Sequence, residues 1–301
     1  MPALKIWLKE LRLEFLTGSA TPVLLGTAVA RYESGSWDPL LFLLTLAGAV
    51  ALHLGANTAN DYFDHLSGND PANVEYVRPF TGGSRLIQEG LIKPRAVLAT
   101  SLSFFGAALA IGLILIAMKG VGVLVLGLIG AACGYFYTAP PLRLAHRGLG
   151  EIVIGISFGL IGPGTYFVQT GEVTLSSVLA TLPVMFLIIA VIWINEFQDS
   201  RADQSAGKNT MVVRLGRKSA VIPFAAITLL AYLPVIAGTL LGELPLITLL
   251  ALITLPLGVR SIAAAGKHYD HPRKLAPANR SAVINHLLTG IILTAIYLIA
   301  G

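Results

Sequence analysis

Residues 38–64 read DPLLFLLTLAGAVALHLGANTANDYFD, an apolar run that closes in a cluster of amide and carboxylate side chains. An apolar helix of this length is typical of segments that cross the ~30 Å hydrocarbon core of a bilayer. The closing residues fit the pattern Asn-acid-aromatic-any-Asp, in which Asn60, Asp61 and Asp64 carry the polar groups. The stretch therefore predicts a transmembrane helix with a polar site at its end.

The composition of the whole chain agrees with a membrane protein. Of its 301 residues 55% are hydrophobic and 12% are charged, whereas a soluble domain has roughly 25% charged residues. We expect an all-α polytopic protein that forms a single domain over residues 1–301. The predicted transmembrane helices are nine: 12–31, 38–62, 96–118, 121–138, 149–168, 176–198, 219–241, 244–263 and 281–300. A break is expected between Gly159 and Gly164, since Gly and Pro interrupt that span.

Basic residues are distributed unequally between the two ends of these predicted spans. All but two of the 21 Lys and Arg residues fall on the side of the N-terminus, and the exceptions are Arg31 and Lys119. Basic loops face the cytoplasm in multi-pass proteins, so we expect the N-terminus and the polar loops to be cytoplasmic and the protein to lie in the cell membrane. Residues 1–11 predict a short interfacial helix anchored by Trp7.

The polar pattern of the second span occurs again in the sixth. Residues 195–203 read NEFQDSRAD, which places Asn195, Glu196, Asp199 and Asp203 at the same end of an equivalent helix. This repetition predicts two parallel halves, residues 12–138 and 149–263, followed by a final helix at 281–300.

Residues four or seven positions apart share one face of a helix. Asn57, Asn60 or Asp61, and Asp64 therefore form one polar stripe, and Asn195, Asp199 and Asp203 form another. Carboxylates that converge near a membrane are costly unless cations lie between them. Their hard oxygen ligands suit Mg2+, which often completes its coordination with substrate phosphates.

A diphosphate in such a site would need cationic partners. The loop after the second span offers Arg78 and Arg85 on either side of Gly82–Gly83, and later loops offer Arg143 and Lys208. Arg suits bidentate phosphate contacts, and glycines can expose backbone N–H groups. The alternative is that these are ordinary basic residues of cytoplasmic loops. Two single residues are expected to be structural: His53 as a packed polar group, and Cys133 as a small residue in close helix packing.

Taken together, the two motifs resemble the UbiA superfamily of intramembrane aromatic prenyltransferases. Asn60, Asp61 and Asp64 match the first motif of that family, whose last Asp is here Gly68, with Asp70 two residues later. The form N-D-Y-F-D-x-x-x-G-x-D is similar to the branch that prenylates 1,4-dihydroxy-2-naphthoate in menaquinone synthesis. In the second motif Glu196 stands where the family usually has Asp. The remaining matches are Asn195, Asp199, Asp203, Arg78, Arg85, Tyr137 and Arg143.

The resemblance implies a nine-helix bundle that transfers a prenyl group from an isoprenyl diphosphate, geranylgeranyl or longer, to an aromatic acceptor with Mg2+. The apolar tail of the isoprenyl diphosphate would lie in a groove open to the lipid bilayer. Nucleic acid is not an expected partner. The implied catalytic residues are Asp61, Asp64, Asp199, Asp203 and Tyr137. The implied metal ligands are Asn60, Asp64, Asp199 and Asp203. The implied substrate-binding residues are Asn57, Asn60, Arg78, Arg85, Arg143, Asn195 and Lys208. Aromatic faces that could stabilise an allylic cation are those of Tyr62, Phe63, Tyr137 and Phe197.

Other functions are compatible with parts of this pattern. Within the family the acceptor could be 4-hydroxybenzoate or glyceryl phosphate. A cation-coupled secondary transporter also uses intramembrane carboxylates, but its site usually lies near the midplane at broken helices, whereas these acids lie at helix ends. A CDP-alcohol phosphotransferase would carry a D-G-x-x-A-R signature, which is absent from the chain.

Overall fold

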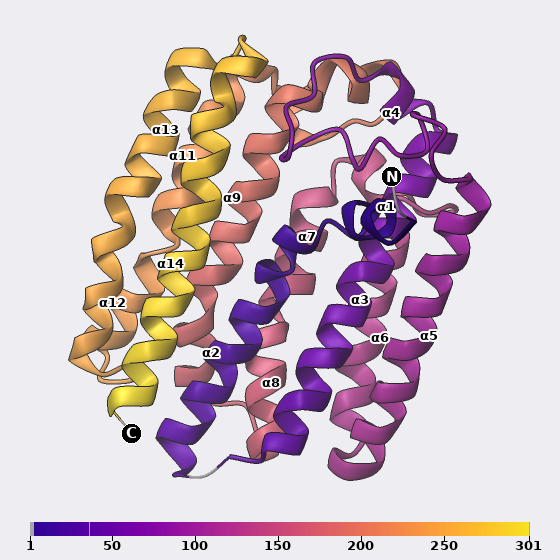
Figure 1. The fold of residues 1–301 in the computed structure, drawn as a ribbon. Helices are drawn as coiled ribbons and strands as arrows, with labels where there is room; N and C mark the ends of the chain where they lie inside the picture. Colours follow the sequence, from indigo (N-terminus) through magenta and orange to yellow (C-terminus); the bar gives the residue numbers. More distant parts are fainter. Residues whose placement is uncertain (1–2, 36, 301) are drawn as a thin grey trace.

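The computed structural model describes residues 3–35 and 37–300, and within these ranges it contains helices and connecting loops without strands. Figure 1 shows the long helices standing side by side in one bundle. The α-helices are α1 (Ala3–Glu10), α2 (Thr17–Ser34), α3 (Pro39–Leu66), α4 (Asn69–Ala72), α5 (Pro94–Lys119), α6 (Val121–Phe136), α7 (Gly150–Gly159), α8 (Ile161–Thr170), α9 (Leu175–Ser205), α10 (Met211–Leu215), α11 (Arg217–Leu230), α12 (Leu233–Leu240), α13 (Leu255–His268) and α14 (Ala276–Ala300). Short 3-10 helices are η1 (Leu13–Phe15), η2 (Leu144–Arg147), η3 (Leu246–Thr254) and η4 (Pro272–Leu275).

Each predicted span coincides with one helix or with consecutive helices. In the described residues seven segments are long and apolar enough to cross a membrane, and an eighth is the bent pair Leu4–Phe15 and Thr17–Ser34, with an angle of 49°. The remaining predicted span corresponds to α6, an apolar helix of 16 residues. Over the residues that the structure describes, the protein is therefore all-helical, with seven to eight candidate membrane helices.

Capping residues fix where the two motif-bearing helices begin. The side chain of Asp38 accepts hydrogen bonds from the N–H groups of Leu40 and Leu41, at 2.7 and 3.1 Å, and so starts α3. Thr174 and Ser177 form a capping box that starts α9. Both helices also continue past the ends predicted from the sequence, to Leu66 and Ser205. Each polar motif therefore lies on helical turns rather than in a loop.

Helix packing places α9 in the interior of the bundle. It contacts α14, α7 and α11, while α2 packs on α14 and α8, and α3 packs on α5. The expected break occurs at Leu160, between α7 and α8. Next to it α2 and α8 approach closely, because a Cβ at Gly26 would lie 2.3 Å from the carbonyl oxygen of Gly162.

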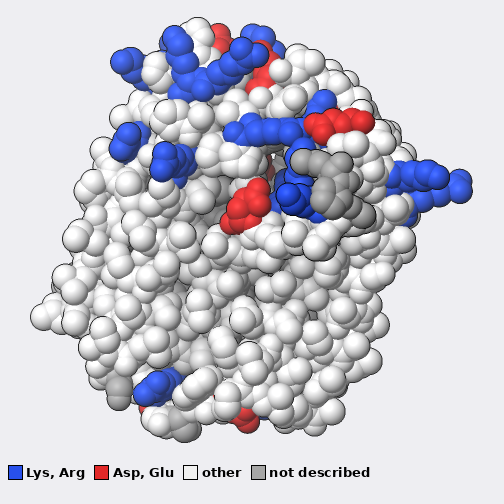
Figure 2. Space-filling model, viewed as in Figure 1, with Lys and Arg blue, Asp and Glu red and all other residues white. Residues whose placement is uncertain are grey.

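The segment between α3 and α5, which includes α4, crosses one end of the bundle (Figure 1). On the face shown in Figure 2, Lys and Arg gather at this same end, and few lie at the opposite end. The helix predicted at residues 1–11 corresponds to α1 (Ala3–Glu10), and residues 1 and 2 of the prediction lie outside the described residues. Its Trp7 packs against Leu86, Ile87 and neighbouring apolar residues of this segment, so Trp7 is anchored to the protein itself.

Candidate active site

A cavity of about 640 Å³ lies below the segment that crosses the end of the bundle. Its polar end is lined by side chains of both motifs and of the crossing segment: Asn57, Asn60, Asp64, Asn69, Asp70, Asn73, Asn195, Glu196, Asp199, Asp203 and Lys208. Its other part is apolar and continues among α3, α5, α6, α7 and α8, past residues such as Phe105, Leu115 and Val168. The cavity therefore joins a charged chamber to a long apolar channel.

The first motif divides between two environments. Asn60 and Asp64 line the cavity, and the amide of Asn60 donates to Asp64 Oδ2 at 3.0 Å. Asp61 is buried and lies outside the cavity lining, where it pairs with Arg12 at 3.3 Å and accepts from the backbone N–H of Ser84 at 3.2 Å. Successive helical residues are rotated by about 100°, so Asp61 faces away from the side that Asn60 and Asp64 share.

The acids of the second motif are held by amides from the first half of the chain. Asn69 Nδ2 donates to Asp203 Oδ1 at 2.8 Å, and Asn73 Nδ2 donates to Asp199 Oδ1 at 2.6 Å. Asn69 and Asn73 are four residues apart around α4, so both amides point to α9. The crossing segment therefore fastens the two halves together at the acidic residues.

Lys208 connects the two motifs directly. Its Nζ lies 3.2 Å from Asp64 Oδ2 and 3.6 Å from Asp203 Oδ1. Burial alone would lower the pKa of Lys208, but the carboxylates of Asp203 and Asp64 outweigh it and raise this pKa well above its usual value. Lys208 is therefore a buried ammonium that balances part of the negative charge of the chamber.

The chamber contains oxygen atoms suited to a hard divalent cation. Asp64 Oδ1 and Asn73 Oδ1 are buried and have no hydrogen-bond partner. Burial, then the carboxylates of Asp64 and Asp61, raise the pKa of Asp70 well above its usual value, as expected of acids gathered without enough positive charge. The described residues contain no group of three or more His, Cys, Asp or Glu arranged to hold a metal ion. The oxygen donors fit Mg2+ in kind, although in this conformation Asn and Lys side chains satisfy the acids.

The predicted glycine turn packs tightly against these acids. Gly83 has a φ of +65°, and a Cβ there would lie 2.9 Å from Asp61 Oδ1 and 3.1 Å from Asp70 Oδ2. Only glycine adopts this conformation readily and leaves this space free. Gly83 thus lets the crossing segment close over the carboxylates.

The three predicted arginines lie outside the cavity lining. Arg78 pairs with Glu89 at 2.5 Å, and both side chains are exposed. Arg85 donates to the carbonyl oxygens of Asp70 and Asn73, and its guanidinium lies 4.7 Å from the ring centre of Tyr76. Arg143 is exposed at the start of η2. Among the predicted cationic residues Lys208 alone lines the cavity, and it is joined there by Arg12, which the sequence did not suggest.

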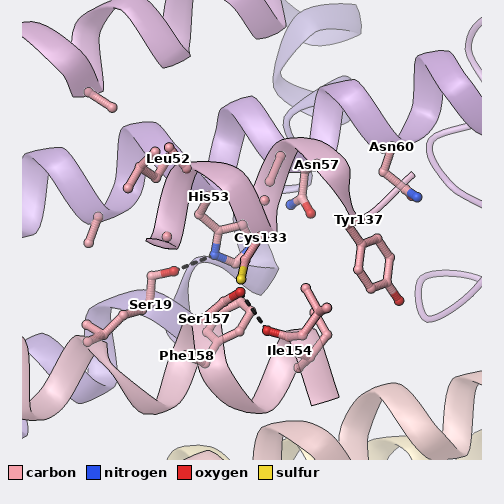
Figure 3. A pocket seen from close by; sticks show the side chains of 18 of the residues that line it. Ser19, Leu52, His53, Asn57, Asn60, Cys133, Tyr137, Ile154, Ser157 and Phe158 are labelled. Carbon is pink, nitrogen blue, oxygen red and sulfur yellow. Dashed lines mark hydrogen bonds between the residues drawn. The ribbon is translucent and has the colours of Figure 1, made fainter. Parts of the chain in front are cut away.

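Of the four aromatic residues considered from the sequence, Tyr137 lines the cavity. Figure 3 shows it near Asn57 and Asn60. A Cβ at Gly150 would lie 3.4 Å from the Tyr137 hydroxyl, so this glycine lets the ring lie close to α7. Phe197 is fully buried in an apolar cluster, and Tyr62 packs on the cluster that contains Leu86.

His53 and Cys133 lie along the apolar channel (Figure 3). His53 Nδ1 is 2.6 Å from Ser19 Oγ, and its ring meets Phe158 edge-on with 5.5 Å between centres. This agrees with a packed polar group that also faces the channel. Cys133, expected in close helix packing, lines the channel instead, while the neighbouring Gly134 approaches Ala56.

Three contributors to the site were not found from the sequence: Arg12, Asn69 and Asn73. For Asn69 and Asn73 the sequence offered one indication of a shared role, namely their spacing of four residues, which places both on the same face of a helical turn. Glu151 lies far from either motif along the chain, yet it is buried on α7, where its Oε1 accepts a hydrogen bond from the backbone N–H of Met211 at 2.9 Å. Sequence spacing on one helix carries no information about such contacts between helices.

Comparisons with known proteins agree with this architecture. Residues 19–297 match the UbiA prenyltransferase family. The chain is 28% identical to the 1,4-dihydroxy-2-naphthoate octaprenyltransferase of Bacillus subtilis, over 93% of this chain and 88% of that one. It is 30% identical to the 2-carboxy-1,4-naphthoquinone phytyltransferase of Synechocystis, over 99% and 94% of the two chains.

Solved structures show the same fold. The apo structure of a UbiA homolog from Aeropyrum pernix matches 94% of this chain and 98% of its own, with a TM-score of 0.71 and 18% identity. A UbiA homolog from Archaeoglobus fulgidus bound to DMAPP and Mg2+ matches 96% of this chain and 99% of its own, with a TM-score of 0.65 and 17% identity. Since the family match covers nearly the whole sequence and its two acidic motifs meet in one cavity, the chain belongs to the UbiA prenyltransferase family.

Proposed function

We propose that this prenyltransferase moves a polyprenyl group from an isoprenyl diphosphate to 1,4-dihydroxy-2-naphthoate with the help of Mg2+. The observation that carries the proposal is the cavity itself, in which an acidic chamber opens into an apolar channel. A ligand with a charged head and a long apolar tail matches this shape. The acceptor is supported by the relatives from Bacillus subtilis and Synechocystis, whose names specify naphthoate and naphthoquinone substrates.

In the chamber, Asn60, Asp64, Asp199 and Asp203 would hold Mg2+. The bound cation would supply Lewis-acid stabilisation of a departing diphosphate. Lys208 and Arg12 line the same space and add positive charge that favours the diphosphate as its negative charge grows. As the allylic carbon–oxygen bond breaks, the face of Tyr137 stabilises the cationic carbon, and the acceptor ring carbon forms the new bond.

The other predicted site residues divide by position. Asn57 and Asn195 line the cavity and are placed to bind substrate. Asp61 acts by positioning, because it holds Arg12 and the crossing segment. Arg85 positions the backbone of Asp70 and Asn73. Arg78 and Arg143 would reach a substrate only from the rim of the cavity.

We further propose that nine segments cross the cell membrane, with the N-terminus and the acidic chamber cytoplasmic. The halves 12–138 and 149–263 would form one domain with the final helix. The concentration of Lys and Arg at the chamber end supports this orientation (Figure 2). The apolar channel would receive a tail of geranylgeranyl length or longer from the bilayer. Labelling of cysteines introduced at exposed Arg78 and Glu243, from either side of sealed vesicles, tests the orientation.

The transfer is tested by incubating the purified protein with geranylgeranyl diphosphate, Mg2+ and 1,4-dihydroxy-2-naphthoate, followed by mass spectrometry. We expect a prenylated product that disappears when EDTA removes the metal. Parallel reactions with 4-hydroxybenzoate and with glyceryl phosphate should yield little product. Transfer to one of these acceptors and not to the naphthoate would overturn the assignment of the acceptor and keep that of the prenyl donor.

A further inference from the structure

One face of α3 carries a row of polar side chains along the cavity. His53, Asn57 and Asn60 are separated by four and then three residues, so they share one side of the helix, and all three line the cavity. Figure 3 shows them following one another, with Tyr137 toward the Asn60 end. Since a helix rises about 1.5 Å per residue, His53 lies about 10 Å along α3 from Asn60. The row therefore continues beyond the proposed metal ligands toward the apolar channel.

His53 is held in one orientation by its neighbours. Its Nδ1 lies 2.6 Å from the hydroxyl oxygen of Ser19 on α2, and its ring meets that of Phe158 edge-on with 5.5 Å between centres. Gly18 leaves room for both rings, because a Cβ there would lie 3.3 Å from Phe158 and 3.7 Å from Cε1 of His53. The imidazole is thus fixed by contacts from α2 and α7.

These contacts determine which nitrogen of His53 carries the proton. The Ser19 hydroxyl has no other hydrogen-bond partner in the described part of the chain, so it donates its proton to Nδ1. A neutral imidazole whose Nδ1 accepts a hydrogen bond carries its own proton on Nε2. This Nε2 makes no hydrogen bond to the described residues and, unlike both ring nitrogens of His146, it is not enclosed by protein atoms. His53 therefore presents an N–H donor to the cavity.

Asn57 offers a second free group one turn away. Its side chain lines the cavity, makes no hydrogen bond within the described residues, and is likewise not enclosed by protein atoms. Two other amides that line the cavity are engaged, since Asn60 donates to Asp64 and Asn195 accepts from Asn279. His53 and Asn57 are thus neighbouring donors that the protein leaves free for a ligand.

The position and chemistry of this pair argue against both parts of the prenyl donor. A diphosphate bound to Mg2+ at Asn60 and Asp64 would lie at the other end of the row from His53. The apolar tail accepts no hydrogen bond, and it would displace water from these donors without replacing the lost hydrogen bonds, which costs affinity. An aromatic acid fits better, because its carboxylate accepts from both donors while its ring lies against Phe158 and Ile154, which line the same part of the cavity (Figure 3).

We propose that His53 and Asn57 bind the carboxylate of the aromatic acceptor and so select acceptors that carry one. The inference rests on the proposed function and assigns the acceptor side of the same cavity. Ser19 is a positioning residue, because it fixes the imidazole in the tautomer that donates from Nε2. A carboxylate held between His53 and Asn57 would place the acceptor ring where the chamber meets the channel, beside the first carbon of the prenyl group.

The test compares two ring ligands that differ in one group, 1-hydroxy-2-naphthoate and 1-naphthol. Both are fluorescent, so their dissociation constants can be titrated without turnover, in the presence of Mg2+ and inorganic diphosphate. We expect His53→Leu to weaken binding of the naphthoate about tenfold or more, as for loss of a hydrogen bond to a charged group, and to weaken binding of naphthol less than about twofold. Asn57→Leu should give the same pattern.

Three further variants separate recognition from packing. His53→Gln keeps a donor near the position of Nε2 and should recover most of the affinity for the naphthoate. Ser19→Ala combined with His53→Leu removes both partners of the inner hydrogen bond, so no unpaired hydroxyl is left, and this double variant should match His53→Leu alone. His286→Leu replaces a buried histidine of α14 outside the cavity, and this matched control should bind both ligands as the wild type does.

Equal weakening of both ligands in His53→Leu would mean that the histidine only packs, and this result would overturn the proposal. A wild type that binds naphthol as tightly as the naphthoate would also overturn it, as would restored naphthoate binding in the double variant. In transfer assays His53→Leu and Asn57→Leu should raise KM for 1,4-dihydroxy-2-naphthoate and leave KM for geranylgeranyl diphosphate nearly unchanged. A wild type that prefers the naphthoate in titrations but transfers no prenyl group to dihydroxynaphthoate would refute the proposed function alone.

Discussion

The ammonium of Lys208 lies 3.2 Å from Asp64 Oδ2, across a sequence separation of 144 residues. A second carboxylate, that of Asp203, lies 3.6 Å from the same nitrogen. The Lys208 side chain therefore joins the two acidic motifs, and its ammonium lies between carboxylates that would also bind a divalent cation.

Replacement of Lys208 by Met should destabilise the metal-free protein. Two buried carboxylates would lose their counter-charge, and loss of one partner from a buried ion pair costs about 3 kcal/mol. We expect the melting temperature in EDTA to fall, and Mg2+ to raise it more in the variant than in the wild type. Thermal melts in detergent with and without Mg2+ measure this, with Lys208→Arg as control. Equal shifts with Mg2+ in both proteins would show that the cation binds elsewhere.

Asp64→Ala and Asp199→Ala should abolish transfer while the protein still inserts and folds. Both carboxylates face the chamber, and loss of a group that stabilises developing charge costs about 100-fold or more in rate. The readouts are product formation and Mg2+-dependent binding of the prenyl diphosphate. The control is Glu243→Gln. An active Asp64→Ala enzyme would remove the metal role assigned to this position.

Arg85 and Arg78 should differ in effect. Arg85→Ala removes hydrogen bonds to the carbonyl oxygens of Asp70 and Asn73, so affinity for the prenyl diphosphate should fall about tenfold or more, since each hydrogen bond from a charged group contributes about 1.5 kcal/mol or more. Arg78 forms an exposed pair with Glu89, which is worth about 0–1 kcal/mol, so Arg78→Ala should change affinity little. Equal losses in a binding titration would indicate that Arg78 reaches the substrate directly.

Gly127 offers a test of the apolar channel. It lies on α6, lines the cavity and has open space where a side chain would stand. Gly127→Leu should raise KM for geranylgeranyl diphosphate about tenfold, because the loss of room for several buried methylene groups costs more than 1 kcal/mol. Dimethylallyl diphosphate should be affected much less. Gly106→Leu, also in open space but outside the cavity, is the matched control. If Gly127→Leu raised KM equally for geranylgeranyl diphosphate and dimethylallyl diphosphate, the prenyl tail would lie elsewhere.

Much of the fold was predictable because hydrophobic runs and helix periodicity are local properties of the sequence. The placement of Asn60 and Asp64 on one cavity-facing side followed from their spacing. Asp61 was grouped with them, but its side chain turned to Arg12 and Ser84, since a neighbouring residue on a helix points in a different direction.

The contacts between distant segments could not be predicted in this way. The amides of Asn69 and Asn73 reach α9 because the segment after α3 folds back over the bundle. The hydrogen bond from the backbone N–H of Met211 to Glu151 depends on where α10 meets α7. These placements depend on tertiary structure, which spacing along one helix does not encode.

The donation by Asn69 and Asn73 to Asp203 and Asp199 also bears on how the chain can be divided. The loop that carries the amides follows α3, and the carboxylates that they reach lie more than 120 residues later. A fragment cut between these segments would carry either the amides or the carboxylates of the site, but not both. Two such fragments would therefore complete the site only by binding to each other, so co-expression of separate fragments would depend on their association in the membrane.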